Sequence, residues 1–360
     1  MKIAVAAGTR PEFIQIEPLI RELDTRNVEY IIIHSGQHYD YEMDQIFFEE
    51  MNLPCPTHYL RIGSKRPCEQ IGDLIIKSEK IFREEQPDIL LISGDTNTTL
   101  GISLAANKSK IKIGHMEAGM RSFDRTMPEE INRILVDNIS DVLLSPTKRG
   151  IENLHNNGIH ENVFLVGDIM LDSLIHYRTL IDNKPRILDE LSLECEKYLV
   201  LTLHREANTD NIHRLTNIID ALSQTDNPVI FPVHPRTKEK LLRHKIRIPE
   251  NIHIIPPAGY FEFLRLLSNS YKLLTDSGGA QKQAFFLAKP CITLRPNTEW
   301  VETLENRWNI LVDDSKEKIL DAIENSAPTG VPQISQFGDG RSSEKIFEAV
   351  STFDSVRKEL

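Results

Sequence analysis

Three carboxylates that could act as general acids and bases lie close together in the sequence, at Asp95, Glu117 and Glu129. The first follows the apolar segment 89–92, and the second follows the apolar segment 111–114. Both segments are typical of short buried strands, and ligands in open α/β sheets bind at the carboxyl ends of strands. The pattern therefore predicts that these side chains lie at the ligand-binding edge of one sheet, where they could transfer protons.

A second interpretation is that each carboxylate stabilises the N-terminus of a helix. Asp95 precedes an expected helix at 98–107, and Glu129 lies in the first turn of another. Acidic side chains are favoured at both kinds of position. Three such residues in one stretch, with an arginine beside two of them, favour a functional site.

Two loops are suited to binding phosphate. The segment 276–279, Asp-Ser-Gly-Gly, follows a strand and opens a helix, and backbone N–H groups at a helix N-terminus bind anions. A plain turn with a serine N-cap would explain the same residues. Gly8-Thr9-Arg10 follows the first strand, where the glycine permits close approach and the arginine could bind phosphate oxygens with its fork. A ligand between the two halves of the chain would meet both loops.

Histidines follow three other expected strands. His204 comes after the apolar run 198–203, where it could bind a diphosphate or move a proton, or only satisfy a loop carbonyl. His234 follows 229–233, and Gln37-His38-Tyr39 follows the second strand. We expect these last two segments to lie at the rim of a site at most.

Composition bounds the class of protein. The 360 residues predict two domains, and 40% apolar with 26% charged residues is typical of a soluble globular protein. The net charge of −11 argues against a nucleic-acid or membrane-surface role. The four cysteines form no CxxC pair, no apolar run reaches the roughly 20 residues that span a bilayer, and no metal-ligand cluster is evident. We therefore expect a cytoplasmic protein without a metal.

Apolar runs and helical patterns alternate along the chain, which predicts an α/β fold with parallel, doubly wound sheets. The expected strands are 2–7, 30–34, 89–93, 111–115, 142–145 and 163–166, then 198–203, 229–233, 252–255, 272–275, 291–294 and 309–312. Two Rossmann-like domains follow, at 1–167 and 168–341, with a hinge near 167–172 and a C-terminal helix at 342–360 that returns to the first domain. Without a GxGxxG or GxxxxGK[ST] motif, we expect no nicotinamide cofactor and no P-loop.

A series of motifs resembles the non-hydrolysing UDP-N-acetylglucosamine 2-epimerases in order and spacing. The motifs are GTRPE at 8–12, QHY…MD at 37–44, GDTNTT at 94–99, HMEAGMR at 115–121, PEEINR at 128–133, LHRE at 203–206, FPVHPRT at 231–237 and TDSGGAQ at 275–281. The resemblance implies two domains like those of GT-B glycosyltransferases, a UDP-sugar in the interdomain cleft, and conversion of UDP-GlcNAc to UDP-ManNAc without a cofactor. It also implies a homodimer that serves polysaccharide biosynthesis.

The resemblance also implies a chemical route and a set of residues. UDP is eliminated across C1–C2, 2-acetamidoglucal stays bound, and UDP adds back with the proton on the opposite face. Carried over by motif, the acid and base groups are Asp95, Glu117 and Glu129, without an order between them. The groups that hold the diphosphate are His204, Arg10 and the amides of Ser277, Gly278 and Gly279. Further substrate contacts are expected from Gln15, Arg121, Arg133, Gln283 and Arg295.

The chain departs from the family pattern at several positions. Gln15 stands where many members carry lysine, and Gln283 stands where a glutamate would bind the ribose hydroxyls. Glu206 replaces the second arginine of a bacterial HRRE pattern, so the allosteric site of that branch is not expected. TEWVE at 298–302 replaces TERPE and resembles the branch that acts on UDP-2,3-diacetamido-2,3-dideoxyglucuronic acid. Trp300 would equally suit a core position.

Other functions remain open. In the uronate branch the sugar carboxylate needs a cationic partner, for which Arg121 and Arg125 are candidates. A GT-B glycosyltransferase shares the architecture, but the carboxylate trio argues against it. A non-catalytic UDP-sugar sensor would not need Asp95, Glu117, Glu129 and His204 together.

Overall fold

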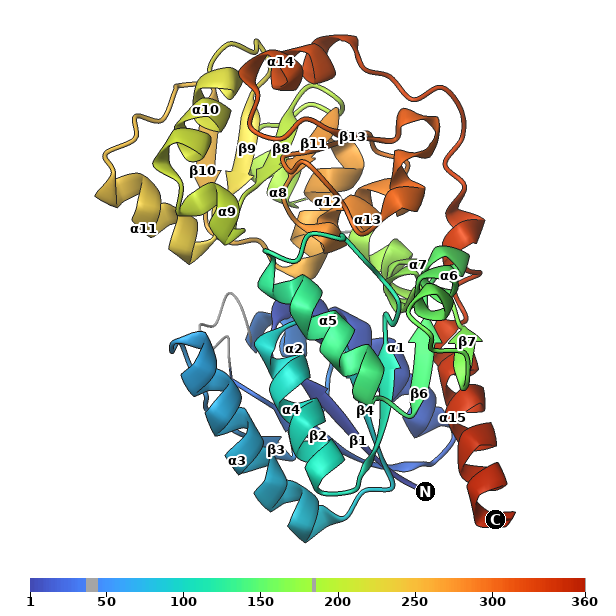
Figure 1. Ribbon diagram of the computed structural model, residues 1–360. Helices are drawn as coiled ribbons and strands as arrows, with labels where there is room; N and C mark the ends of the chain where they lie inside the picture. The colour runs from blue at the N-terminus through green and yellow to red at the C-terminus, as the bar shows by residue number, and fades with distance from the viewer. Residues whose placement is uncertain (37–44, 183–185, 360) are drawn as a thin grey trace. The chain divides into compact units, whose positions relative to one another are not determined.

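The computed structural model describes residues 1–36, 45–182 and 186–359, so the predicted rim segment Gln37-His38-Tyr39 lies outside the described residues. The chain forms two compact units (Figure 1). Unit 1 comprises Met1–His176 and Ser335–Leu360, and unit 2 comprises Tyr177–Ile334.

The sheet of unit 1 is parallel throughout, with the strand order β3-β2-β1-β4-β5-β6-β7. Its strands are β1 (Lys2–Ala7), β2 (Glu29–His34), β3 (His58–Tyr59), β4 (Ile89–Ser93), β5 (Lys112–Met116), β6 (Val142–Ser145) and β7 (Val163–Leu165). Continuous apolar runs suit this sheet because helices cover both of its faces. The strand order reverses between β1 and β4, and ligands of such sheets bind at this switch point.

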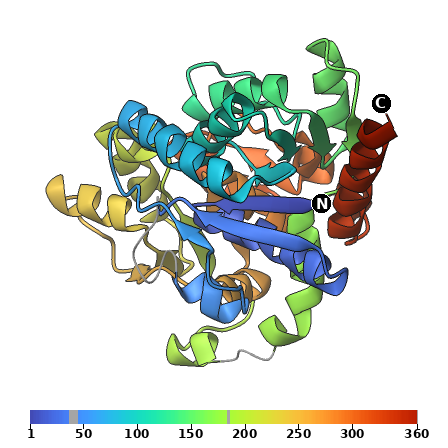
Figure 2. The same ribbon diagram turned by 90° about the horizontal axis from the view of Figure 1, so that it is seen from below.

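Helices pack on both faces of the first sheet (Figure 2). They are α1 (Arg10–Thr25), α2 (Gln45–Glu50), α3 (Pro67–Glu85), α4 (Asn97–Lys108), α5 (Pro128–Ile139), α6 (Lys148–Asn156), the start of α7 (Ile169–Asp182), and α15 (Ser342–Glu359). Figure 1 shows α3, α4 and α5 side by side, and they contact one another in that order. A core of buried apolar side chains joins α3 and α4 to the strands. On another side, α15 packs against α1 and β6.

Unit 2 repeats the same topology with the order β10-β9-β8-β11-β12-β13. Its strands are β8 (Leu199–Thr202), β9 (Val229–Pro232), β10 (Ile252–Ile255), β11 (Lys272–Thr275), β12 (Cys291–Thr293) and β13 (Asn309–Leu311). Its helices are α8 (Arg186–Glu190), α9 (Glu206–Thr209), α10 (Ile212–Leu222), α11 (Pro235–Arg243), α12 (Tyr260–Asn269), α13 (Gly278–Phe286), η2 (Val301–Arg307) and α14 (Lys316–Asn325), with η3 (Ile334–Phe337) at the boundary. The switch point lies between β8 and β11. The predicted class, two Rossmann-like domains with parallel sheets, is confirmed.

The boundary between the units lies inside α7, whereas the sequence placed it at 167/168. The start of α7 is held within unit 1 because Asp172 accepts hydrogen bonds from Ser342 N at 3.0 Å and Ser343 N at 2.8 Å. Ser173 Oγ donates to Ile14 O at 2.8 Å. These contacts also attach the beginning of α15 to unit 1. The second segment of unit 1 begins at Ser335, whereas the sequence placed its start at 342.

Candidate active site

In unit 1, one buried carboxylate joins the loops that follow β1 and β4. Glu12, in the first turn of α1, is 2% exposed. Its Oε2 accepts hydrogen bonds from Gly8 N at 2.7 Å and Thr9 N at 2.9 Å. Its Oε1 accepts from Thr96 Oγ1 at 2.7 Å and Thr99 Oγ1 at 3.2 Å. Burial raises the pKa of Glu12, although these donors act in the opposite direction.

Close packing explains the glycine of the β1 loop. A β-carbon at Gly8 would overlap Ser35 Oγ and would lie 2.7 Å from Thr98 Oγ1. These two hydroxyl groups are hydrogen-bonded to each other at 2.9 Å. Arg10 begins α1, and its guanidinium lies 5.3 Å from the centre of the Phe47 ring. Its role in binding a diphosphate stays a prediction.

Asp95 is held from α5. Arg133 Nη2 forms an ion pair with Asp95 Oδ2, and Asn132 Nδ2 donates to Asp95 O at 2.9 Å. The other side of the Arg133 fork contacts Glu130, with 2.7 Å between Nη1 and Oε2. Glu129 precedes Glu130 in the first turn of α5 and is partly exposed. The structure therefore pairs two predicted site residues, Asp95 and Arg133, and it places Glu129 on α5, the same helix as Arg133.

Glu130 is a site residue that the sequence did not single out. Its Oε2 accepts from Ser122 N at 2.8 Å and Ser122 Oγ at 2.9 Å, and its Oε1 accepts from Phe123 N at 3.2 Å. The buried carboxylate thus fixes the loop that runs from Glu117 to Glu129. Its place in the PEEINR motif was visible, but only burial separates its role from that of Glu129.

A second buried carboxylate of α5, Asp137, orders the loop that carries Glu117. Its Oδ1 is 2.7 Å from His115 Nδ1, and its Oδ2 is 2.6 Å from Arg121 Nη1 and accepts from Gly119 N at 3.2 Å. Glu117 has a φ of +64°. This backbone conformation is uncommon for residues other than glycine, and residues that adopt it are often found at functional sites. Arg121 is buried and paired, while its Nε and Nη2 have no hydrogen-bond partner in the described chain.

In unit 2, Asp276 joins the loops that follow β8 and β11. This fully buried carboxylate accepts from His204 N at 3.1 Å, Arg205 N at 3.0 Å and Asn208 Nδ2 at 3.2 Å, all through Oδ2. His204 Nδ1 lies 3.1 Å from Asp276 Oδ1. Burial by itself would raise the pKa of Asp276, but His204 and the hydrogen bonds hold it below its ordinary value.

This contact orients the imidazole of His204. Because Nδ1 faces Asp276, the opposite ring nitrogen Nε2 is available to a ligand, and the side chain is 38% exposed. His234 lies near it, with 6.0 Å between the ring centroids. Asp276 was part of a predicted motif, but its partnership with His204 depends on the pairing of β8 with β11.

The N-terminus of α13 has a serine cap. Ser277 Oγ accepts from the backbone N–H three residues later at 3.4 Å. A β-carbon at Gly278 would overlap Glu299 Oε1 and would lie 2.9 Å from Trp300 Nε1. Capping and packing therefore explain Ser277 and Gly278, and phosphate binding by these residues and Gly279 stays a prediction.

Arg295 is engaged within its own chain. The residue is 5% exposed, and Nη2 donates to Glu299 Oε2 at 2.7 Å and to Asn297 Oδ1 at 3.3 Å. Nη1 donates to Glu299 Oε1 at 3.4 Å. Any anion that contacts Arg295 must therefore share it with Glu299.

The TEWVE segment packs on α13. Trp300 is buried, as a core residue would be, and Lys282 Nζ lies 3.8 Å from a ring centroid of its indole. Thr298 Oγ1 donates to Gln281 Oε1 at 2.6 Å. The aromatic face stabilises a buried ammonium group, since such contacts strengthen on desolvation.

The two glutamines that depart from the family pattern are both buried. Gln15 lies in α1, and its Oε1 has no hydrogen-bond partner within the described residues. Gln283 lies in α13 and is 5% exposed. Their predicted contacts with substrate stay predictions.

Glu206 neutralises part of a basic helix. Arg236, at the start of α11, donates from Nη1 to Glu206 Oε1 at 2.7 Å and from Nη2 to Asp210 Oδ2 at 2.6 Å. Lys240 Nζ lies 3.0 Å from Asp210 Oδ1. The substitution that distinguishes this chain from the bacterial HRRE pattern therefore forms an ion pair on the surface of unit 2.

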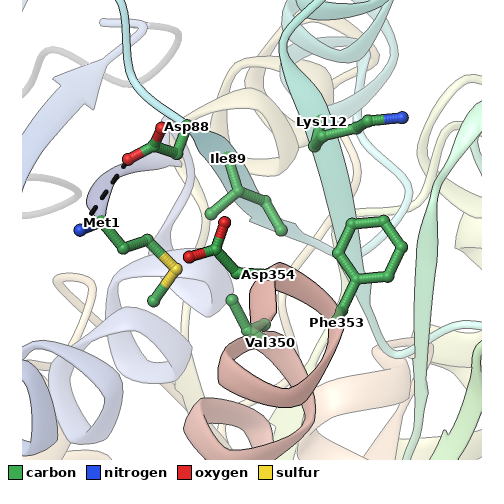
Figure 3. Close-up of a pocket in the computed structure, with 7 residues that line it drawn as sticks. All are labelled: Met1, Asp88, Ile89, Lys112, Val350, Phe353 and Asp354. Carbon is green, nitrogen blue, oxygen red and sulfur yellow. Dashed lines mark ion pairs between the residues drawn. The ribbon is translucent and has the colours of Figure 1, made fainter. Parts of the chain in front are cut away.

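A small recess lies at the opposite, amino-terminal edge of the first sheet (Figure 3). It is lined by Met1, Asp88, Ile89, Lys112, Val350, Phe353 and Asp354. Its volume of about 10 Å³ is room for roughly one water molecule, so it does not accommodate a nucleotide.

Within residues 1–36, 45–182 and 186–359, no group of three or more His, Cys, Asp or Glu side chains is arranged to hold a metal ion. Among the described helices, none is long and apolar enough to cross a membrane.

Known proteins resemble this chain along nearly its whole length. A family model described as UDP-N-acetylglucosamine 2-epimerase matches residues 21–351. A "UDP-N-acetylglucosamine 2-epimerase homolog" of Methanococcus maripaludis is 49% identical, over 97% of this chain and 99% of its own. The crystal structure of Methanocaldococcus jannaschii UDP-GlcNAc 2-epimerase in complex with UDP-GlcNAc and UDP has a TM-score of 0.92 and 44% identity, covering 98% of this chain and 100% of that one.

A relative with a different substrate is also similar. The UDP-2,3-diacetamido-2,3-dideoxy-D-glucuronate 2-epimerase of Pseudomonas aeruginosa is 38% identical, over 97% of this chain and 99% of its own.

Proposed function

Because the chain belongs to the UDP-N-acetylglucosamine 2-epimerase family, as its motifs predicted, we propose that this isomerase interconverts UDP-GlcNAc and UDP-ManNAc. The observation that carries the proposal is the attachment of Asp95 to α5, where Arg133 binds its carboxylate and Asn132 binds its backbone. A carboxylate held at the carboxyl end of β4 suits proton transfer at C2 of the sugar, because geometry decides first whether a group can act as acid or base.

The proposed reaction has two steps, elimination of UDP and its re-addition, and the second step reverses the bond changes of the first. A carboxylate removes the C2 proton, the C2–H electron pair forms the C1=C2 double bond, and the C1–O bond breaks with its electrons on the departing UDP. A carboxylic acid then delivers a proton to the opposite face of C2 while the UDP oxygen attacks C1. Asp95, Glu117 and Glu129 share the acid and base roles in this proposal.

Negative charge grows on UDP as the C1–O bond breaks, so positioned donors stabilise the transition state. We assign this task to His204, Arg10 and the amides at the start of α13. The support for His204 is the contact of its Nδ1 with Asp276, which leaves Nε2 to face a diphosphate oxygen. In the imidazolium form both ring nitrogens carry a hydrogen, so Nε2 can donate to that oxygen. Arg10 supports the assignment by its position at the start of α1, directly after the loop that Glu12 holds.

The test is NMR of the purified protein with UDP-GlcNAc in D2O. Elimination and re-addition predict UDP-ManNAc with deuterium at C2 and small amounts of free UDP. Retention of the original C2 hydrogen through turnover would exclude this route. A glycosyltransferase or a UDP-sugar sensor would form no epimer in the same tube, which contains no acceptor sugar.

A second substrate is favoured by a specific observation. The buried Lys282–Trp300 contact belongs to the TEWVE variant, and a diacetamidoglucuronate epimerase is 38% identical. Arg125, exposed in the loop between Glu117 and Glu129, is a candidate partner for the sugar carboxylate. The comparison to make is kcat/KM for both sugars on one preparation. A uronate preference above about 100-fold, near 2.7 kcal/mol, would replace UDP-GlcNAc as the substrate.

The same proposal includes a homodimer in the cytoplasm that supplies polysaccharide biosynthesis, and it needs no cofactor. Analytical ultracentrifugation of the purified chain tests the dimer, and activity in metal-free buffer with a chelator tests the last point. A sedimenting monomer or a chelator-sensitive rate would each remove the corresponding statement.

A further inference from the structure

The hydrogen-bond network around Asp276 continues past the groups that touch it. Asn208, in α9, is 1% exposed and uses both ends of its side-chain amide. Its Nδ2 donates to Asp276 Oδ2 at 3.2 Å and to Leu294 O at 2.9 Å. Its Oδ1 accepts from Arg214 Nε at 3.0 Å. One amide therefore connects the β11 loop, the end of β12 and α10.

Arg214 is itself held by two carboxylates. Its Nη1 donates to Asp314 Oδ1 at 3.0 Å, and its Nη2 donates to Asp313 Oδ1. Asn217 Nδ2 supports the same loop by donating to Asp314 Oδ2 at 3.1 Å. The guanidinium is thus bound on three sides, and its Nε points in a fixed direction toward Asn208.

The orientation of the Asn208 side-chain amide in this network has a chemical reason. A side-chain amide can be turned end for end, and a turned Asn208 would place its oxygen against the carboxylate of Asp276. Arg214 Nε can only donate, so its bond to Oδ1 stabilises the orientation in which Nδ2 faces Asp276. The arginine thereby selects the one amide orientation that completes the set of donors around Asp276.

We propose that Asn208 and Arg214 are positioning residues that act through Asp276 to hold the imidazole of His204 toward the UDP leaving group. The inference rests on the proposed function, in which His204 binds the diphosphate. Neither residue touches substrate. Their effect is to keep Asp276 fixed, so that His204 presents the same nitrogen throughout the reaction.

A purely structural role is the alternative, because the same bonds also tie α9, α10 and β12 together. Two variants separate the roles. Asn208→Asp keeps the shape but sets a carboxylate beside Asp276. Arg214→Lys keeps a cation near Asp313 and Asp314 but removes the Nε donor. The matched control is Asn251→Asp, since Asn251 Nδ2 donates to Leu222 O at 2.9 Å and Thr225 O at 3.0 Å, away from this network.

The experiment measures kcat and KM for UDP-GlcNAc, the melting temperature, and the NMR signal of the His204 N–H proton that faces Asp276, assigned by its loss in His204→Asn. We expect Asn208→Asp to lower kcat by about 10- to 100-fold and Arg214→Lys by about 3- to 10-fold, since small misplacements at a reacting centre have effects of this size. Both variants should shift or broaden the imidazole signal. Asn251→Asp should lower only the melting temperature.

The inference is wrong if both variants lose melting temperature like the control while kcat and the imidazole signal stay as in the wild type. The readouts also separate this result from a failure of the proposed function. A wild-type protein that does not epimerise UDP-GlcNAc refutes the function, whereas the imidazole signal still reports whether Asn208 and Arg214 position His204. If Asn208→Asp does not fold, Arg214→Lys provides the same test with a milder change.

Discussion

In each unit a buried carboxylate joins the two loops beside the switch point of the sheet, but the two carboxylates differ in what they hold in place. In unit 1 the carboxylate of Glu12 joins the loops after β1 and β4, and in unit 2 the carboxylate of Asp276 joins the loops after β8 and β11. Both pairs of strands flank the switch point of a Rossmann-like sheet. The two side chains come from opposite loops, since Glu12 follows the first strand of its unit and Asp276 follows the strand beside it.

The donors around the two carboxylates explain their opposite pKa directions. Among the described residues, Glu12 meets only neutral amides and hydroxyls, so burial dominates and raises its pKa. Asp276 also meets His204, and this interaction with the hydrogen bonds outweighs burial and lowers its pKa. The comparison indicates that Glu12 mainly holds backbone in place, whereas Asp276 holds a titratable side chain that a ligand can reach.

The largest expected effect distinguishes, within unit 1, a carboxylate that transfers protons from one that only holds the backbone in place. Asp95→Asn should lower turnover by roughly 100-fold or more, because it removes a positioned acid or base while keeping the shape. Glu12→Gln should reduce turnover much less and should act on stability. Steady-state kinetics and thermal melts of both variants make the test. A Glu12→Gln enzyme that is as inactive as Asp95→Asn, with an unchanged melting temperature, would end the distinction between the two carboxylates.

The next prediction compares how much the carboxylates of Asp276 and Glu12 contribute to the free energy of unfolding. Asp276→Asn should lower the free energy of unfolding by about 2–3 kcal/mol, since hydrogen bonds to a charged group are the stronger ones. Glu12→Gln should lower it by about 1–2 kcal/mol, because its donors are neutral. Urea unfolding at pH 7 gives both values. The reverse ranking would mean that the charge on Asp276 contributes little.

The pH dependence of stability should differ in sign between the two. The lowered pKa of Asp276 means that its contribution is complete above the ordinary aspartate value of about 3.9 and is lost as pH falls through the native pKa. The raised pKa of Glu12 means that stability decreases as pH rises from the ordinary glutamate value of about 4.3 through the native pKa. Urea midpoints between pH 3 and 8 for Asp276→Asn and Glu12→Gln should each lose one of these slopes. Parallel curves for both variants and the wild type would contradict the assignment.

The smallest expected effect concerns the two buried glutamines, one in each unit. Gln283→Glu should tighten UDP binding by about 0.5–1 kcal/mol if this position faces the ribose hydroxyls, because a charged acceptor strengthens the hydrogen bond. Gln15→Glu, the matched change in unit 1, should weaken binding, since it places a negative charge beside the predicted phosphate loop. Isothermal titration with UDP measures both. Equal affinities for the two variants would place neither glutamine at the nucleotide.

Local sequence determined most of the secondary structure. The expected bounds of β1, β4, β6, β10 and β11 agree with the structure, because each is an apolar run that ends at turn or polar residues. The strand β3 (His58–Tyr59) was missed, since two residues are too few to show a periodicity. The helix α1 begins at Arg10, where the carboxylate of Glu12 accepts a hydrogen bond from the amide of the N-cap residue Thr9.

Only the tertiary structure decided which polar residues meet. The motifs indicated Asp95, Arg133 and His204 by type, yet their partners come from residues distant in the chain: Asp276 reaches His204 because β11 pairs with β8. Arg295 was predicted to bind substrate, which stays a prediction, and the folded chain also presents Glu299 to its fork. A sequence shows where a chain can carry charge, but burial decides whether that charge is met by its own chain, because an unpaired buried charge costs too much free energy to persist.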